Sequence, residues 1–185
     1  MISDVRNMDC MEFMRQFPDK FFDLAVVDPP YGIHMDGGMI GGGKKCKPTE
    51  YVKKDWDKHA PGVCYFQELR RVSKNQIIFG ANHFISKNPI DSPCWIVWDK
   101  QNTGNCADCE LAWTSFDKSV KKFAFTWNGM LQGNMKDKEA RIHPTQKPRA
   151  LYTWIFENFT GGGAEDIRHS FGLRIQQNSR LACRS

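Results

Sequence analysis

Residues 21–32 read FFDLAVVDPPYG, and this stretch decides the fold. The apolar, β-favouring residues up to Val27 predict a short buried strand of the kind found inside parallel sheets. Asp28 ends that strand, and Pro29 and Pro30 stop it because proline cannot continue a sheet ladder. In open α/β sheets the ligand crevice lies beyond the carboxyl ends of the strands. We therefore expect Asp28 and the residues after it to face a ligand.

The rest of the chain alternates between helical and strand-like patterns. Helical spacing of apolar residues predicts helices over 8–17, 63–72 and 149–159. Short β-favouring runs predict further strands over 75–82, 94–100, 110–116 and 121–128. This order predicts an α/β fold, a largely parallel sheet with helices on both faces and a hairpin at one edge. Gly80-Ala81-Asn82 and Asp99-Lys100 should then lie at the same edge of the sheet as Asp28.

Composition limits the class of protein. The 185 residues suffice for one domain, and the net charge of +5 is compatible with nucleic acid without requiring it. No apolar run approaches the roughly 20 residues of a membrane helix, and charged residues occupy the start, so we expect an intracellular protein with reduced cysteines. Cys106 and Cys109 form one C-x-x-C without an obvious second pair, which argues against a zinc site.

The residues Asp28-Pro29-Pro30-Tyr31 have a distinctive chemistry. Two prolines fix the backbone and carry no N–H, so the segment is a stiff platform with outward carbonyls beside a carboxylate and an aromatic ring. Such a platform suits a planar amine, for example a base flipped out of a duplex. The alternative is an ordinary turn after a strand, since Asp-Pro is common turn chemistry. Local features alone favour the turn.

Two motifs in this chain resemble those of a known enzyme family. Asp28-Pro29-Pro30-Tyr31, preceded by FDLAVV, resembles the signature of DNA amino-methyltransferases that use S-adenosylmethionine (SAM). His143-Pro144-Thr145-Gln146-Lys147-Pro148 resembles the segment before the SAM-binding strand in the permuted (β) subgroup of that N6-adenine/N4-cytosine family. Asn7-Met8-Asp9-Cys10 resembles the turn that places a carboxylate near the SAM adenine. The resemblance covers about residues 4–160.

The resemblance implies a Rossmann-like methyltransferase sheet and a set of site residues. Asp at the first position of the motif favours adenine N6 over cytosine N4 as the methyl acceptor. The implied catalytic residues are Asp28, Pro29, Pro30 and Tyr31. The implied cofactor-binding residues are Asp9, Cys10, Asp28, His143, Thr145, Gln146 and Lys147, with SAM as the cofactor and no metal.

The resemblance also implies partners. Double-stranded DNA is the expected substrate, and Lys44, Lys45 and Lys47 in the Gly- and Lys-rich loop 32–47 are candidates for phosphate contacts. The alternative for these lysines is a solvated loop. Residues 128–142 are the candidate target-recognition segment. A homodimer or a complementing chain, and a cytoplasmic location in a prokaryote or phage host without membrane attachment, complete the expectation.

The pattern breaks after Phe159. The family pattern continues with a strand and a Gly-rich turn such as D-T-H-x-G-S-G-S, whereas residues 160–185 read TGGGAEDIRHSFGLRIQQNSRLACRS. Back-translating AEDIRHSFGLRIQQNSRLA and dropping one base gives, with suitable codons, K-I-(L/F)-D-T-H-L-G-S-G-S-S-R-I-A-A. We therefore expect residues 161–185 to be a disordered, out-of-frame tail, which leaves the fold incomplete at the C-terminus and an open edge on the strand before Asp28.

Without the Gly-rich turn, we expect weak SAM binding and no catalysis by the chain as written. Three alternatives remain open at this point. The first is a cytosine-N4 or RNA methyltransferase, the second is a non-catalytic DNA-binding remnant, and the third is a zinc-binding module.

Overall fold

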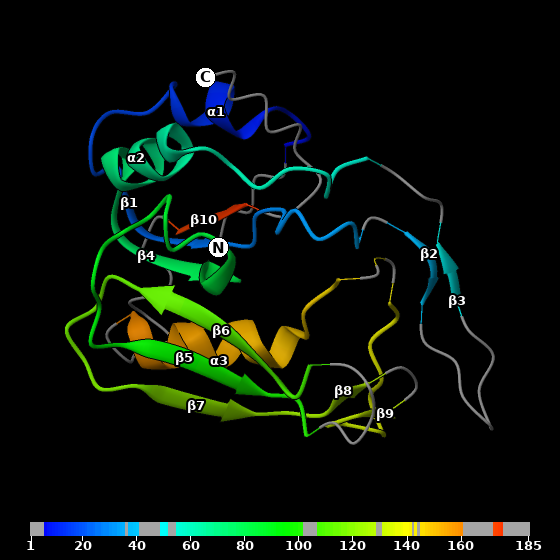
Figure 1. Ribbon diagram of the computed structural model, residues 1–185. Coiled ribbons are helices and arrows are strands. Elements are labelled where there is room, and N and C mark those ends of the chain that lie inside the picture. The colour runs from blue at the N-terminus through cyan, green and yellow to red at the C-terminus, as the bar shows by residue number, and fades with distance from the viewer. Residues whose placement is uncertain are drawn as a thin grey trace.

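The strand β1 (Phe22–Val27) lies inside a six-stranded mixed sheet in the computed structural model of the chain (Figure 1). The structure describes residues 6–35, 37–40, 49–51, 55–101, 107–128, 131–141, 143, 145–160 and 172–175. The strand order is β10–β1–β4–β6–β5–β7. The other five strands are β4 (Ser73–Phe79), β5 (Trp95–Asp99), β6 (Cys109–Thr114), β7 (Lys121–Ala124) and β10 (Gly172–Ile175).

The strands of this sheet run parallel except β6. Val27 lies opposite Ile78 in the parallel β1–β4 pair, whereas Ile78 lies opposite Trp113 in the antiparallel β4–β6 pair. The predicted hairpin is therefore present as β5–β6, but its antiparallel strand lies between β4 and β5 and not at an edge, which corrects the prediction. Ala112, Trp113 and Thr114 of β6 are buried, and an interior place in the sheet covers them from both sides.

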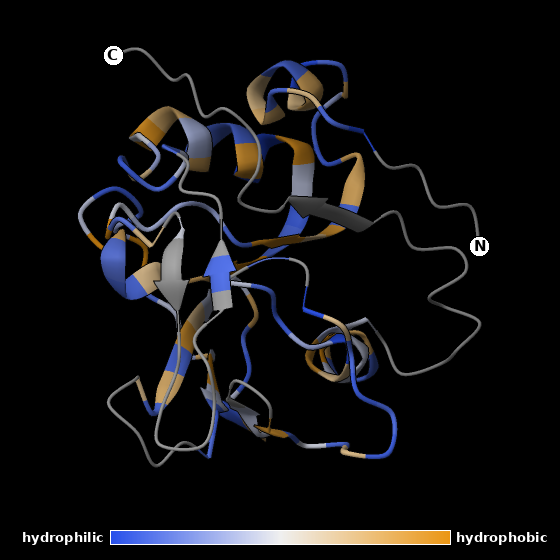
Figure 2. Ribbon diagram, turned by 90° about the vertical axis from the view of Figure 1, so that its right-hand side faces the viewer, coloured by the Kyte–Doolittle hydropathy of each residue, from blue (hydrophilic) through white to orange (hydrophobic). Residues whose placement is uncertain are grey.

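Helices cover both faces of the sheet (Figures 1 and 2). The helices α1 (Cys10–Met14) and α2 (Val63–Val72) pack on one face, together with Ala25 and Val27 of β1. The helix α3 (Arg149–Phe159) packs on the other face. Each helix carries both hydrophobic and hydrophilic residues in Figure 2, as expected when one side lies on a sheet.

The bounds of α2 and α3 confirm the predictions made from apolar periodicity, but α1 is shorter than the predicted 8–17. Asp9 caps its start by accepting from the N–H groups of Met11 and Glu12. At its end, the N–H groups of Gln16 and Phe17 bond three residues back, so the last turn tightens and the α-helix stops.

Two small hairpins lie beyond the sheet, on the side of the strand ends. β2 (Gly38–Ile40) pairs antiparallel with β3 (Thr49–Tyr51), where the sequence predicted a loop over 32–47, and this pair projects away from the sheet in Figure 1. β8 (Trp127–Asn128) pairs with β9 (Leu131–Gln132) at the start of the candidate target-recognition segment 128–142.

The tail supplies one described strand. Residues 172–175 form β10, which pairs parallel with Leu24–Val27, so the expectation of an open edge on β1 is wrong along those residues. The other residues of 161–185 lie outside the described residues.

Cys64 is disulfide-bonded, whereas composition predicted reduced thiols throughout. Among the described residues, no helix combines the length and apolar character that crossing a membrane requires.

Candidate active site at the carboxyl end of the sheet

The predicted convergence of strand ends is confirmed. Asp28 follows β1, Gly80 follows β4 and Asp99 ends β5, and these strands run in the same direction. Because β6 runs the opposite way, the residues at its start reach this edge too, and Glu110 lies opposite Trp98 in the ladder. Three strand ends and the beginning of β6 therefore meet at the same edge, where Asp28, Asp99 and Glu110 supply carboxylates.

A chain of alternating charges begins at Asp28. Its carboxylate is 4% exposed, and Oδ2 lies 2.7 Å from Nζ of Lys147. The same Nζ lies 3.2 Å from Oε2 of Glu110, whose Oε1 lies 2.5 Å from Nζ of Lys100. Oδ1 of Asp28 accepts a hydrogen bond of 2.8 Å from the Tyr31 hydroxyl. Two carboxylates thus alternate with two ammonium groups, which offsets the cost of burying them.

Burial and these neighbours shift the titration of the cluster. Burial raises the pKa of Asp28, and Lys147 opposes the rise only in part. Burial would raise the pKa of Glu110 as well, but Lys147 and Lys100 lower it to about 2. Burial would lower the pKa of Lys147, yet Asp28 and Glu110 raise it well above its ordinary value. Lys147 is therefore a cation at neutral pH.

Tyr31 is held by its ring as well as by its hydroxyl. The ring stacks on His83, with centroids 5.0 Å apart and planes inclined by 17°. On another side it lies against Gly80, where a Cβ would stand 2.2 Å from Cε1 of the ring. Gly80 also has φ +66°, a conformation that side chains rarely adopt. A residue with a side chain at position 80 would therefore collide with the Tyr31 ring, and glycine leaves the space that the ring occupies.

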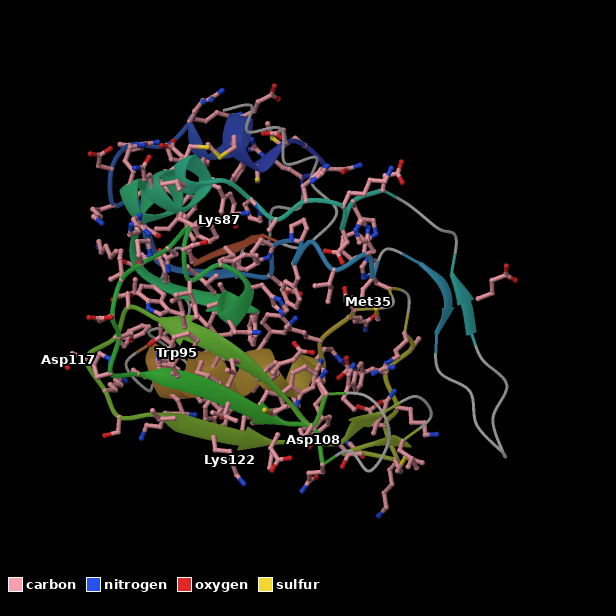
Figure 3. All side chains as sticks on the ribbon, in the orientation of Figure 1. Met35, Lys87, Trp95, Asp108, Asp117 and Lys122 are labelled. Carbon is pink, nitrogen blue, oxygen red and sulfur yellow. The ribbon has the colours of Figure 1, made fainter. Side chains whose placement is uncertain are left out.

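The backbone after the motif is fixed by Asp57, which is 1% exposed. Its Oδ1 accepts hydrogen bonds from the N–H groups of Tyr31 and Gly32, at 2.7 and 2.9 Å. Its Oδ2 accepts from the N–H of Met35 at 2.7 Å, and Figure 3 labels Met35 where the chain leaves the sheet toward β2. Sequence reasoning placed Lys100 at this edge together with Asp99, but it missed Asp57 and Glu110, since neither lies in a recognisable local motif.

The second predicted motif lies beside the first, and the two meet at Lys147. The centroids of the His143 and Trp56 rings lie 5.2 Å apart, and Nδ1 of His143 lies 3.1 Å from Oγ1 of Thr145. The carbonyl of Gln146 accepts from Nε1–H of Trp127 at 2.6 Å. Predicted cofactor contacts of His143, Thr145, Gln146 and Lys147 stay predictions, and Pro144 lies outside the described residues.

At the start of α1, polar atoms remain available for a ligand. Oδ1 of Asp9 accepts the capping bonds, whereas its Oδ2 is buried and has no hydrogen-bond partner among the described residues. The Tyr65 hydroxyl of α2 is likewise buried without a described partner, and burial raises its pKa well above its ordinary value. Two buried polar atoms on this face of the sheet can thus accept or donate further bonds.

Other predicted contacts cannot be placed. Lys44, Lys45, Lys47 and Cys106 lie outside the described residues. Within the part of the chain that the structure describes, no group of three or more His, Cys, Asp or Glu side chains is arranged to hold a metal ion.

Comparison with known proteins agrees with this chemistry. No family model matches the chain. Over 81% of its length it is 23% identical to the type II methyltransferase M.HinfI of Haemophilus influenzae. The chain is similar to type II methyltransferases. A second relative, M1.MboII of Moraxella bovis, is 29% identical over 55% of the chain.

These similarities support the methyltransferase family that the two motifs indicate, and the mixed sheet with helices is consistent with an α/β methyltransferase fold. The alignments cover 54% of M.HinfI and 38% of M1.MboII, so the chain matches about half or less of each relative.

Proposed function

We propose that this chain carries the methyl-acceptor half of a SAM-dependent DNA methyltransferase with a Rossmann-like sheet, acting on adenine N6. The observation that carries the proposal is the buried Asp28 carboxylate at the end of β1, followed by two prolines and by Tyr31. A rigid acceptor beside an aromatic ring is the arrangement that orients an exocyclic amine.

Asp28 retains capacity for the amine. A carboxylate offers about four acceptor positions, and Tyr31 and Lys147 use two of them. The remaining positions, with the Pro29 carbonyl, would accept the two amino hydrogens of adenine, drawing the nitrogen lone pair out of the ring and toward the methyl donor. Because burial raises the pKa of Asp28, its carboxylate is also a better acceptor for the proton released on methylation.

The ring of Tyr31 supports the base. We propose that the extruded adenine stacks against Tyr31, whose position His83 and Gly80 fix. Stacking of a base on an aromatic side chain contributes about 1–3 kcal/mol.

The residues at the start of α1 fit one end of SAM. The Oδ2 of Asp9, which has no hydrogen-bond partner among the described residues, can accept hydrogen bonds from the cofactor, and we propose that Cys10 lies against the cofactor as well. When bound, SAM supplies the electrophilic methyl group. On the other side we propose that His143, Thr145 and Gln146 shape the pocket. Both the Asp28 and the Glu110 carboxylates lie within 3.2 Å of Nζ of Lys147. We therefore propose that the main role of Lys147 is to neutralise these two carboxylates and not to bind SAM.

Residues 161–185 lack the Gly-rich turn of the family, so we propose that SAM binding and turnover by these 185 residues are weak or absent. The coding DNA read in the neighbouring frame should encode D-T-H-L-G-S-G-S. If that frame contains no such motif, the hypothesis of an out-of-frame tail is wrong.

The test of the function uses tritiated SAM and unmethylated duplex DNA, with RNA in parallel. The chain as written and a chain restored to the neighbouring frame are incubated, and the nucleic acid is digested to nucleosides. We expect N6-methyladenine from the restored chain, and none when it carries Asp28→Ala. N4-methylcytosine or labelled RNA would instead favour the corresponding alternative.

A further inference from the structure

We infer that Asp57 is a positioning residue that holds the acceptor motif in its working shape and fixes the base of the projecting β2–β3 hairpin. It does not touch the reacting atoms. Its role in catalysis rests on the proposed function, whereas its role in shaping residues 31–35 does not.

The geometry around Asp57 is that of an anion received by backbone N–H groups. Three peptide N–H groups, from Tyr31, Gly32 and Met35, converge on its two oxygens at 2.7–2.9 Å. The carboxylate has no cationic partner among the described residues, so these peptide dipoles compensate its charge. The backbone carbonyl of Asp57 also accepts from the N–H of His34 at 3.2 Å.

These bonds join two segments that lie 22 to 26 residues apart in sequence. The hairpin β2–β3 lies between them, so the chain leaves the sheet and returns to it at one fixed point. Figure 1 shows the hairpin extending away from the body of the molecule beyond this point.

Neighbouring contacts make the junction rigid. Gly32 has φ +74°, and a Cβ there would stand 3.0 Å from the backbone nitrogen of Ala60. Trp56, next to Asp57, packs its ring on His143 of the second motif. The turn around Asp57 therefore contacts both motifs, and loss of its carboxylate should free the backbone that carries Tyr31.

The substitutions separate shape from charge. Asp57→Asn keeps the size of the side chain, but its NH₂ group would meet an N–H donor, and Asp57→Ala removes all three bonds. The matched control is Asp55→Asn, the same chemical change two residues away on an exposed carboxylate whose described ion pair is with Lys58. Circular dichroism checks that each variant folds, and Asp57→Asn carries the test if Asp57→Ala does not.

The first readout is backbone amide exchange and chemical shift, measured by NMR on the 185-residue protein. We expect the amides of Tyr31, Gly32 and Met35 to exchange about 10- to 100-fold faster in both Asp57 variants, and to lose the downfield shift of a charged acceptor. Amides of β1 and β4, and all amides of Asp55→Asn, should be unchanged. Unchanged exchange at the three amides in folded Asp57→Asn would overturn the inference.

The second readout is the fluorescence of a DNA duplex carrying 2-aminopurine opposite an abasic site, from which the base is easily extruded. Adding wild-type protein should change the 2-aminopurine fluorescence as the base is extruded. We expect this change to be about tenfold or more smaller with Asp57→Asn, and to have its wild-type size with Asp55→Asn. A preserved response despite faster amide exchange would overturn the positioning role. No response from the wild-type protein would count against base capture, and so against the proposed function, while the amide result still decides whether Asp57 holds the loop.

Discussion

At the scale of single residues, Lys147 is the centre of the buried charge cluster. It is 4% exposed and neutralises Asp28 and Glu110 together. Lys147→Met should therefore leave the buried Asp28 and the half-buried Glu110 without their shared cation and lower the free energy of unfolding by about 3–5 kcal/mol. Urea unfolding measures this loss.

The control for that variant is Lys122→Met, because Lys122 pairs with Asp99 at the surface, with 65% of its side chain exposed. Its cost should stay below about 1 kcal/mol. Adding Asp28→Asn to Lys147→Met should recover part of the lost stability. Equal costs for the two lysine variants would show that the cluster does not contribute to folding as described.

Glu110 predicts a specific acid response. Its pKa is about 2 in the folded protein, against an ordinary 4.5, so its contribution is complete above about pH 4.5 and is lost as the pH falls toward 2. The raised pKa of Asp28 acts with the opposite sign, because burial makes ionisation of Asp28 less favourable in the folded state than in the unfolded chain. The comparison of wild type with Glu110→Gln isolates the first effect.

We expect the stability difference between wild type and Glu110→Gln to shrink by about 3 kcal/mol between about pH 5 and about pH 2. Urea unfolding at several pH values across that window measures it. A difference independent of pH would mean that Glu110 is not a low-pKa carboxylate in the folded protein.

The sequence predicted part of this site. The D-P-P-Y motif and Lys147 were identified because they lie in continuous local patterns. Glu110 and Asp57 were missed because their roles depend on partners brought close by the fold, from 10 to 37 positions away in sequence. Neither residue differs locally from an ordinary surface carboxylate.

At the scale of elements, the start of α3 depends on a side chain from the preceding loop. Both carboxylate oxygens of Glu139 accept from the Arg149 N–H, at 2.9 and 3.1 Å, and Gln132 binds the backbone of Glu139 at both its N–H and its carbonyl. This arrangement satisfies a helix N–H that has no partner inside the helix. It also orders the loop that leads to Lys147.

Glu139→Ala should therefore cost about 1–2 kcal/mol of stability, since a bond to a charged acceptor is lost. Asp137→Ala is the control, because among the described residues the Asp137 carboxylate pairs just with the exposed Arg149 side chain, at 3.7 Å. Thermal unfolding of both variants distinguishes them, and the prediction is wrong if the two transitions shift equally.

Elements also show where periodicity stops being informative. The spacing of apolar residues predicted α2 and α3 to the residue, because a helix face repeats within its own sequence. It did not predict that β6 enters the interior of the sheet, since alternation in a strand is the same for parallel and antiparallel neighbours.

At the scale of the whole molecule, the proposed DNA contact predicts a salt dependence. The logarithm of the DNA-binding constant falls linearly with the logarithm of the salt concentration. If Lys44, Lys45 and Lys47 each neutralise one phosphate, replacing all three with Ala should make this slope shallower by about three. Fluorescence anisotropy of labelled duplex DNA across a salt series measures the slope. An unchanged slope would support a solvated loop instead.

Because β6 is reversed, one carboxylate of the candidate site lies on a strand of the sheet, and this position affects how the site can change in evolution. Glu110 belongs to a strand of the main sheet, held opposite Trp98, whereas Asp57 and the described part of the segment 128–142 lie outside that sheet, in loops and in the small β8–β9 hairpin. Loops tolerate exchange and insertion far better than paired strands do. If the proposed function holds, exchanging these loops would change which DNA sequence is recognised, while the counterion arrangement around Asp28 would be inherited with the sheet.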